Sequence, residues 1–328
     1  MSSLSLKSRY GIKEPQRTVN GKLKIAVLTG GIGSERDISI QSGQCISQAL
    51  IAGGFDVVTA DIQPDNLDIL EDNSIDVFFP ALHGKFGEDG RLQQILKDKS
   101  LVYTGSGPAE SKLAFDKMTS KKLFAEAGVA TPAATEFNAD SDINQLETQL
   151  KYFADEYVVK PIREGSSVGV RIVTDVQEVI STAEQTLKEF GDCMIEQFIP
   201  GKEITVGILE EQTLPIIEIR SKTGFYDYQA KYIDEQTQYL FDTITQPALI
   251  TQIEQDAMDC FRALGCLQFA RVDFILSDEP IAYALEINTI PGFTTHSLLP
   301  KAAAKAGLTM SDLCSKIVAA AHSALLRR

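Results

Sequence analysis

The sequence predicts an α/β protein of two or three domains that begins with a parallel β-sheet. Its 328 residues are more than one domain usually holds. In the first third of the chain, apolar runs typical of buried strands alternate with stretches of helical spacing, which favours a parallel sheet covered by helices. Near the C-terminus a short turn separates two strand-like segments, and this predicts a hairpin.

The N-terminal unit is predicted from strands, a glycine turn and one clear helix. Its three strands are expected over 24–28, around 57–58 and over 77–79. A glycine-rich turn follows the first strand, and helical spacing then runs over 39–52 until two glycines end it. The first two dozen residues are basic but lack the apolar core of a signal peptide, so we expect a mobile tail over 1–22.

Two further units follow, the second from about residue 105 and the third after Pro200-Gly201. The second is predicted to contain helices over 116–127 and 176–190 and strands over 157–160, over 168–173 and up to 196. The third is predicted to contain strands over 204–209 and 214–219, a helix over 247–264, the hairpin and two closing helices.

Composition excludes several classes of function. The net charge of −14 argues against general binding to nucleic acid or to an anionic membrane, both of which need a basic face. The five cysteines are scattered and lack Cys-x-x-Cys spacing, so we expect free thiols in a reducing cytoplasm. No apolar run approaches the length that spans a membrane.

The glycine turn after the first strand invites comparison with a dinucleotide-binding motif. The G-x-G-x-x-G pattern fails, however, because its third glycine would fall on Arg36. A helix N-terminus with free backbone N–H groups remains, suited to an anion or a polar substrate, and Glu35 beside it could accept an ammonium group. A plain capped turn is the alternative.

The hairpin carries charge where a buried strand should be apolar. Since successive side chains point to opposite faces, Arg271 and Asp273 share one face, as do Glu286 and Asn288. Two carboxylates and an amide oxygen without histidine or cysteine suit magnesium, which usually completes its shell with water and phosphate oxygens. The hairpin therefore points to an enzyme that uses a nucleoside triphosphate. The alternative is an exposed strand face with a structural ion pair.

A second segment favours phosphate binding. Lys160 ends a strand and offers a point charge, and the Gly165-Ser166-Ser167 loop after it can bring backbone N–H groups close to phosphate. A solvent-exposed hairpin would tolerate the same loop. The run 196–199 ends the next strand and could present backbone groups and a carboxamide to adenine, with Glu203 spaced to reach a ribose. Glu196 and Glu203 could equally be plain surface acids.

A long polar stretch over 221–240 separates the third unit's first strands from its helix. Loops of this length in compact domains are usually functional or disordered. Tyrosines gathered in this stretch argue against disorder. We therefore expect a lid that closes over the substrate and excludes water.

With these residues in place, the chain resembles the ATP-grasp enzymes, and among them the D-alanine–D-alanine ligase family, from about Lys24 to the C-terminus. The motifs that carry the resemblance are Gly30-Gly31, Ser34-Glu35-Arg36, Ala81-Leu82-His83-Gly84, Gly87-Glu88-Asp89-Gly90, Tyr103-Thr104-Gly105-Ser106, Asp116-Lys117, the loop 160–169, Phe225-Tyr226-Asp227-Tyr228, Lys231-Tyr232, Glu286, Asn288, Pro291-Gly292 and His296-Ser297-Leu298.

The resemblance implies a three-domain ATP-grasp architecture. A Rossmann-like N-terminal domain of parallel sheet would occupy 23–105, and two α+β domains enclosing the nucleotide would occupy 106–198 and 199–328. The last of these would carry the lid and the catalytic hairpin.

The resemblance also implies a two-step reaction. One D-alanine carboxylate takes the γ-phosphoryl group of ATP, and the amine of a second D-alanine attacks the acylphosphate to give a dipeptide for peptidoglycan precursors. ATP would be bound by Lys117, Lys160, Ser167, Glu196, Gln197, Phe198, Ile199, Glu203 and Lys231. Two Mg²⁺ or Mn²⁺ ions would be bound by Asp273, Glu286 and Asn288, with a monovalent cation as a further candidate.

The remaining roles concern the amino acids. The catalytic set implied by the resemblance is Glu35, Ser166, Tyr232, Arg271 and the Gly292 N–H, and the substrate-binding set is His83, Ser297 and Leu298. Within these sets Glu35 would bind the first ammonium, Arg271 would stabilise the oxyanion, and Ser166 with Tyr232 would link the glycine–serine loop to the lid and to Glu35.

Some of these roles have structural alternatives. His83 could be a satisfied turn histidine, Ser297 could simply cap a helix, and Arg271 could be a structural partner of Asp273. Ligation of D-alanine to D-lactate or D-serine, another ATP-grasp carboxylate–amine ligation, and nucleotide binding without turnover are the competing functions. The tyrosine-rich lid favours an amine acceptor. We expect a cytoplasmic homodimer.

Overall fold

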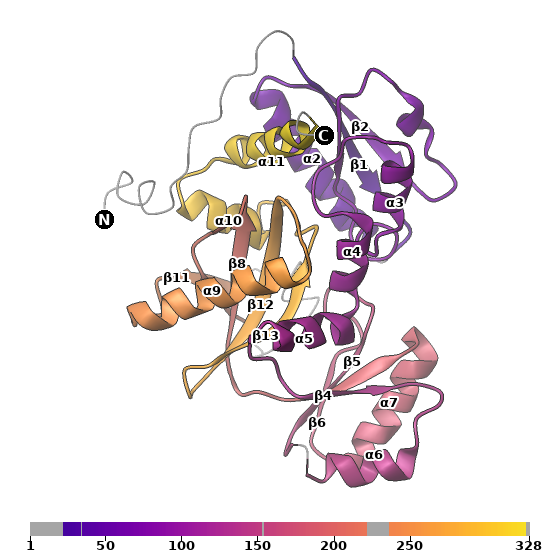
Figure 1. The fold of residues 1–328 in the computed structure, drawn as a ribbon, viewed down its shortest axis with the longest axis vertical. Coiled ribbons are helices and arrows are strands. Elements are labelled where there is room, and N and C mark those ends of the chain that lie inside the picture. Colours follow the sequence, from indigo (N-terminus) through magenta and orange to yellow (C-terminus); the bar gives the residue numbers. More distant parts are fainter. Residues whose placement is uncertain (1–21, 34, 153, 222–235, 326–328) are drawn as a thin grey trace.

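A computed structural model describes residues 22–33, 35–152, 154–221 and 236–325. The strands of these residues form three β-sheets. Figure 1 shows the N-terminal and C-terminal parts side by side, with the middle of the chain below them. Within the described residues no helix is long and apolar enough to cross a membrane. The α/β architecture with an N-terminal parallel sheet is confirmed.

The N-terminal sheet has three parallel strands in the order β2-β1-β3. These are β1 (Lys24–Gly30), β2 (Asp56–Ile62) and β3 (Val77–Pro80). Helix α2 (Arg36–Ala52) links β1 to β2 and begins three residues before the predicted start. Gly30 and Gly31 have φ values of 94° and 88°, so the chain turns sharply after β1 and places Glu35 directly before the helix.

Short helices complete the N-terminal part and lead out of it. A 3₁₀ turn η1 (Asp68–Glu71) precedes β3, and α3 (Arg91–Asp98) follows it. Helices α4 (Pro108–Phe115) and α5 (Lys117–Glu126) come next, with Asp116 between them as the N-cap of α5. Its carboxylate accepts the Thr119 N–H at 2.9 Å.

The middle of the chain forms a four-stranded antiparallel sheet in the order β4-β7-β5-β6. Its strands are β4 (Ala134–Phe137), β5 (Tyr157–Pro161), β6 (Arg171–Val173) and β7 (Cys193–Gln197). Helix α7 (Val176–Phe190) has the predicted bounds, whereas β4 and α6 (Ile143–Leu150) were not predicted. The strand predicted over 168–173 is wrong in its first half, because positive φ values at Ser166, Ser167 and Gly169 keep the chain in turns.

The C-terminal sheet has the order β11-β10-β8-β12-β13, with β9 paired to β8. Its strands are β8 (Gly201–Leu209), β9 (Gln212–Thr213), β10 (Ile217–Arg220), β11 (Gln238–Phe241), β12 (Phe269–Ser277) and β13 (Ala282–Asn288). The strand predicted from residue 214 starts later, since Pro215 has no N–H to donate. The predicted loop 221–240 ends in β11, and residues 222–235 lie outside the described residues.

Helices cover both faces of this sheet. Helix α9 (Pro247–Ala263) packs on one face, where Ile253 and Phe261 meet Phe274 of β12. Phe124 of α5 belongs to the same core, so α5 lies against the C-terminal sheet although it precedes the middle sheet in the chain.

The closing helices connect the C-terminal part to the N-terminal sheet. Side chains of α10 (Leu298–Lys305) and α11 (Met310–Leu325) share one core with β1, β3 and α2, and Figure 1 shows α11 beside α2. Phe79, Phe269 and Phe293 meet in this core, and the Phe79–Phe293 and Phe269–Phe293 ring centroids are 5.7 and 5.9 Å apart. This packing holds the segment after β13 against the N-terminal sheet. The domain boundaries at 105 and 198 stay a prediction.

Candidate active site

Two cavities open between the three parts of the fold, and their walls have three residues in common. The smaller measures about 90 Å³ and the larger about 380 Å³. Lys117, Glu164 and Glu286 line both. The larger volume is typical of a small-molecule site. The two cavities are therefore neighbours that share a wall at these three residues.

Every predicted site residue that the structure describes lines one or both cavities. The smaller is lined by Glu35, His83, Lys117, Ser166, Arg271, Glu286, Asn288, Gly292, Ser297 and Leu298. The larger is lined by Lys117, Lys160, Ser167, Glu196, Gln197, Phe198, Ile199, Glu203, Asp273 and Glu286. Lys231 and Tyr232 lie outside the described residues. Their individual roles remain predictions.

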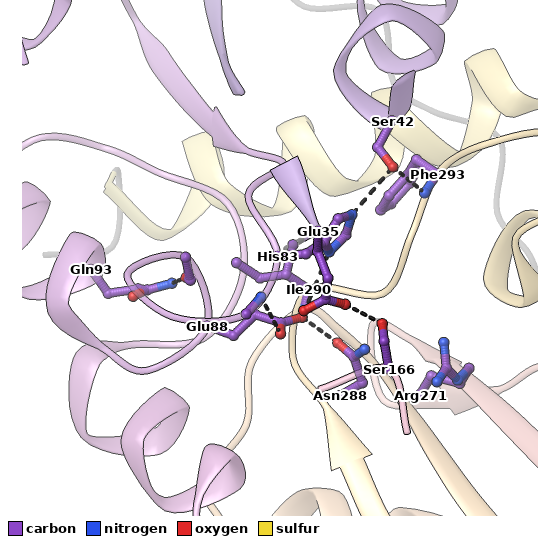
Figure 2. A network of polar contacts seen from close by, with 12 residues as sticks. Glu35, Ser42, His83, Glu88, Gln93, Ser166, Arg271, Asn288, Ile290 and Phe293 are labelled. Atoms are coloured by element: carbon purple, nitrogen blue, oxygen red, sulfur yellow. Dashed lines mark hydrogen bonds and ion pairs between the residues drawn. The ribbon is translucent and has the colours of Figure 1, made fainter. Parts of the chain in front are cut away.

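Glu35 links the N-terminal sheet to the glycine–serine loop. It directly precedes α2 and is buried, and the Ser166 hydroxyl donates a hydrogen bond to its Oε1 (Figure 2). The loops on either side approach it closely, since a Cβ on Gly84 or Gly165 would lie 2.7 or 2.9 Å from its Oε2. Glycine at both positions therefore lets the carboxylate occupy this place.

His83 lies beside Glu35 in a chain of polar contacts that the sequence only partly indicated. Its Nε2 is 3.2 Å from Ser42 Oγ, which also accepts the Phe293 N–H at 3.2 Å, and its Nδ1 is 3.7 Å from Glu88 Oε1. Glu88 is held in turn by the Gly84 N–H, at 2.8 Å from its Oε2. Figure 2 shows this group reaching from α2 to the segment after β13.

Burial lowers the pKa of His83, but the ion pair with Glu88, the charge of Glu35 and a backbone hydrogen bond with Ile290 outweigh it. The pKa of His83 is therefore raised above its ordinary value, which favours the cation. Ser42 and Glu88 were not predicted. Glu88 could have been predicted, because it belongs to the Gly87-Glu88-Asp89-Gly90 motif and lies five residues after His83.

The hairpin is antiparallel as predicted, with Arg271 opposite Asn288 and Asp273 opposite Glu286. The register shifts after Asp273. Arg271 donates to both oxygens of Asp273, at 2.9 Å from Nε and 2.7 Å from Nη2. Arg271 therefore contacts Asp273, as the structural alternative proposed, and it also lines the smaller cavity.

The oxygen donors of the predicted metal set have protein partners. Thr205 Oγ1 donates to Asp273 Oδ1 at 2.6 Å, and Asn288 Oδ1 accepts the Ile290 N–H at 2.9 Å. The Lys117 ammonium is 3.3 Å from Glu286 Oε2 and donates to the Glu164 carbonyl at 2.6 Å. Asp273 lines the larger cavity, Asn288 the smaller and Glu286 both, and two carboxylates with an amide oxygen are a donor set that fits a hard cation.

The larger cavity is walled by strand ends and by a buried ionic cluster. Lys160 at the end of β5 donates to Glu196 Oε2 of β7 at 2.6 Å, and Lys121 of α5 donates to the other oxygen, Oε1. The Gln197 and Phe198 N–H groups donate to Ala133 and Glu156 carbonyls at 2.8 and 3.0 Å. These two N–H groups are therefore committed to the protein rather than to a nucleobase.

Ser297 and Gly292 form the far wall of the smaller cavity. Ser297 precedes α10, but its side chain does not cap the helix; its Oγ accepts the Thr294 N–H at 2.9 Å. A Cβ on Gly292 would lie 2.7 Å from that Oγ. The capping alternative for the Ser297 hydroxyl is thus wrong, and the first turn of α10 faces the cavity with its N-terminal end.

Comparison with known proteins finds similarity along most of the chain. Residues 65–106 match the family described as D-ala D-ala ligase N-terminus, and residues 123–319 match D-ala D-ala ligase C-terminus. The D-alanine–D-alanine ligase of Syntrophotalea carbinolica is 43% identical over 93% of this chain and 98% of its own length. That of Geotalea uraniireducens is 39% identical over 91% and 95%.

Solved structures are similar over the same extent. The D-alanine–D-alanine ligase of Bacillus anthracis complexed with ATP has a TM-score of 0.80 at 33% identity, covering 93% of this chain and 99% of that one. The VanG D-Ala:D-Ser ligase of Enterococcus faecalis has a TM-score of 0.79 at 27% identity, covering 92% and 100%.

Proposed function

This chain belongs to the D-alanine–D-alanine ligase family, and we propose that it joins two D-alanine molecules at the expense of ATP. The product would be D-alanyl-D-alanine for peptidoglycan precursors. The observation that carries the proposal is the meeting of two cavities at Lys117, Glu164 and Glu286. A phosphoryl donor in the larger cavity and an amino acid in the smaller would meet there, which phosphoryl transfer to a carboxylate requires.

In the first step, the carboxylate of one D-alanine attacks the γ-phosphorus of ATP and ADP leaves. Lys160 lines the larger cavity and Lys117 lines both, which supports the proposal that their ammonium groups bind phosphate oxygens. Asp273, Glu286 and Asn288 would hold two Mg²⁺ or Mn²⁺ ions. Such ions neutralise charge on the transferred phosphoryl group when they are bound. A monovalent cation remains a further candidate.

The first D-alanine would be oriented by two charged groups. The Glu35 carboxylate is buried at the cavity wall and suits an ammonium group. His83, whose pKa is raised by Glu88, suits the region of the substrate carboxylate when it is protonated. Both side chains are fixed by hydrogen bonds, so little conformational entropy of Glu35 and His83 would be lost when the substrate binds.

In the second step, the neutral amine of the second D-alanine attacks the acylphosphate carbonyl. The tetrahedral intermediate then expels phosphate, and the nitrogen loses a proton as the amide forms. Arg271 and Gly292 both line the smaller cavity, and Arg271 with the Gly292 N–H would stabilise the oxyanion; one such donor is typically worth ~3 kcal/mol. Ser297 and the Leu298 N–H would bind the acceptor carboxylate at the start of α10.

The test is phosphate release from ATP, with the products separated by mass. D-alanine should support phosphate release and yield D-alanyl-D-alanine, whereas L-alanine should not. Parallel reactions would contain D-alanine with D-lactate, with D-serine, or with a γ-glutamyl acceptor. Formation of a depsipeptide or of D-alanyl-D-serine in excess of the dipeptide would overturn the proposed acceptor. ATP binding without turnover on any amino acid would overturn the proposed reaction.

Two properties of the whole molecule belong to the proposal. We place the enzyme in the cytoplasm, where ATP is available and where its five cysteines, all free in the structure, would stay reduced. We also propose a homodimer, as the family resemblance implies. Light scattering after size exclusion measures its mass, and the mass of a single chain would contradict it.

A further inference from the structure

Beside Lys160 lies a second buried lysine for which the proposed reaction has no role. Lys121 lies on α5, one turn after Lys117, and only 5% of its surface is exposed. It is not one of the residues that line either cavity as the described part of the chain forms them. A lysine is rarely buried unless it is paired with an opposite charge, because desolvation of its ammonium group is costly.

Lys121 and Lys160 bind the same carboxylate. Glu196 is 2% exposed, and its Oε1 accepts from Lys121 while its Oε2 accepts from Lys160 at 2.6 Å. Burial raises the pKa of Glu196, but the charges of Lys160 and Lys121 outweigh it and the pKa is lowered. Burial lowers the pKa of Lys121 to about 8, against the attraction of Glu196, so it is still charged at neutral pH. Two cations and one anion leave a net charge of +1.

We propose that Lys121 is a positioning residue that keeps the charge of Lys160 available to the phosphates of ATP. With Lys121 present, Glu196 orients Lys160 without cancelling the positive charge of the cluster. Without Lys121, the buried carboxylate would have Lys160 as its one remaining cation among the described residues, and the pair would be neutral. The inference rests on the proposed function, in which Lys160 binds phosphate.

Lys121 also connects the cluster to the strand that carries Glu286. Its Nζ donates to Thr131 Oγ1 at 2.7 Å, and this hydroxyl donates to the Ala284 carbonyl of β13 at 2.8 Å. The Ala284 N–H returns a hydrogen bond to the Ala130 carbonyl at 2.8 Å. Lys121 thus holds Lys160 on the middle sheet in a fixed relation to the hairpin of the C-terminal sheet.

The first experiment measures the affinity for a non-hydrolysable ATP analogue and for adenosine by calorimetry. Lys121→Met should weaken the analogue roughly tenfold and leave adenosine within about twofold, because the lost charge acts on phosphate. Lys122→Met is the matched control, since its side chain on the same helix is 77% exposed, and it should change neither affinity. Equal weakening of both ligands, or none, would overturn the inference.

A second variant separates charge from packing. Adding Glu196→Gln to Lys121→Met restores the net charge of +1 on Lys160, so the analogue should bind more tightly than to Lys121→Met alone. A purely structural role predicts a further loss, and that result would overturn the inference. Should Lys121→Met fold poorly, Lys121→Gln, whose amide can still donate to Thr131, replaces it in both comparisons.

Lys160→Met distinguishes failure of this inference from failure of the proposed function on which it rests. Unchanged binding of the analogue to Lys160→Met would overturn the role of Lys160 in the proposed function. Weaker binding to Lys160→Met together with unchanged binding to Lys121→Met would overturn the inference alone.

Discussion

The two cavities of the site are held together in different ways. In the smaller one, polar side chains from distant parts of the chain bind one another directly, as Ser166 binds Glu35 and Ser42 contacts His83. In the larger one, the ends of β5, β7 and β8 form much of the wall, and Lys160 is held by a carboxylate behind it. The smaller cavity therefore depends on how the three parts of the fold meet.

This difference predicts which property each change affects. A side chain in the smaller cavity is fixed by a few directional contacts, so its loss should act on chemistry or on D-alanine binding. The larger cavity gathers contacts from many residues, so a single change there should weaken ATP binding by degrees. Changes to the Arg271–Asp273 ion pair, which joins a residue of the smaller cavity to one of the larger, should have the largest effect.

Arg271→Ala and Asp273→Ala remove either half of the ion pair on β12 and should abolish turnover. A loss of roughly a hundredfold or more is expected, because each change removes a charge near the transferred group. Circular dichroism should show both variants folded, and Arg262→Ala, an exposed arginine on α9, is the control. Rates like those of the wild type in either variant would remove that residue from the reaction.

Gly165→Ala tests the close approach of the glycine–serine loop to Glu35. The new Cβ would lie 2.9 Å from Glu35 Oε2, so the carboxylate must shift, and the KM for D-alanine should rise roughly tenfold. The KM for ATP should change much less. Gly33→Ala is the matched control, because its nearest neighbour is the Glu35 backbone nitrogen at 3.9 Å. A larger effect on ATP than on D-alanine would contradict the division between the cavities.

The sequence predicted the hairpin well because alternation along a strand is a local property. Arg271 with Asp273 and Glu286 with Asn288 were assigned to shared faces, and the two pairs lie opposite each other. The bulge after Asp273 could not be predicted from the sequence, because it depends on how β12 pairs with β8 and β13. The Arg271–Asp273 contact was foreseen only as an alternative, because alternation cannot tell whether a charge faces a ligand or its neighbour.

Lys121 and the glycine–serine loop show what local sequence patterns cannot predict. Lys121 and Lys122 are adjacent on a helix rich in charged residues, and the sequence does not tell them apart. Lys121 is buried because it contacts Glu196 of β7 where α5 packs beside β13, whereas Lys122 is exposed. The glycine–serine loop was placed correctly near the site, but the positive φ values of Ser166 and Ser167 shortened the predicted strand. These outcomes depend on contacts between residues far apart in the chain.

The charge of His83 predicts a pH dependence for D-alanine that ATP should not share. The raised pKa extends the protonated form of His83 to higher pH than an ordinary histidine allows, and the KM for D-alanine should rise as pH increases through that pKa. Glu88→Gln removes the carboxylate charge that opposes the effect of burial, so the rise should move to lower pH. Glu71→Gln, an exposed acid elsewhere in the N-terminal part, should leave the profile unchanged. A profile that Glu88→Gln does not move would contradict the cationic role of His83.

The smallest effect is expected at an exposed ion pair beside the cavities. Lys85 binds the Glu164 carboxylate and so links the loop after His83 to the glycine–serine loop, but half of the lysine side chain is exposed. Exposed pairs contribute about 0–1 kcal/mol, because water and salt screen them. Lys85→Met should therefore lower stability by no more than about 1 kcal/mol in chemical denaturation and raise either KM by less than about fivefold. The contact of Glu164 with Lys117 runs through its backbone carbonyl and survives this change. A loss of turnover comparable to that of Arg271→Ala would mean that the two loops, rather than the buried contacts behind them, hold the cavities together.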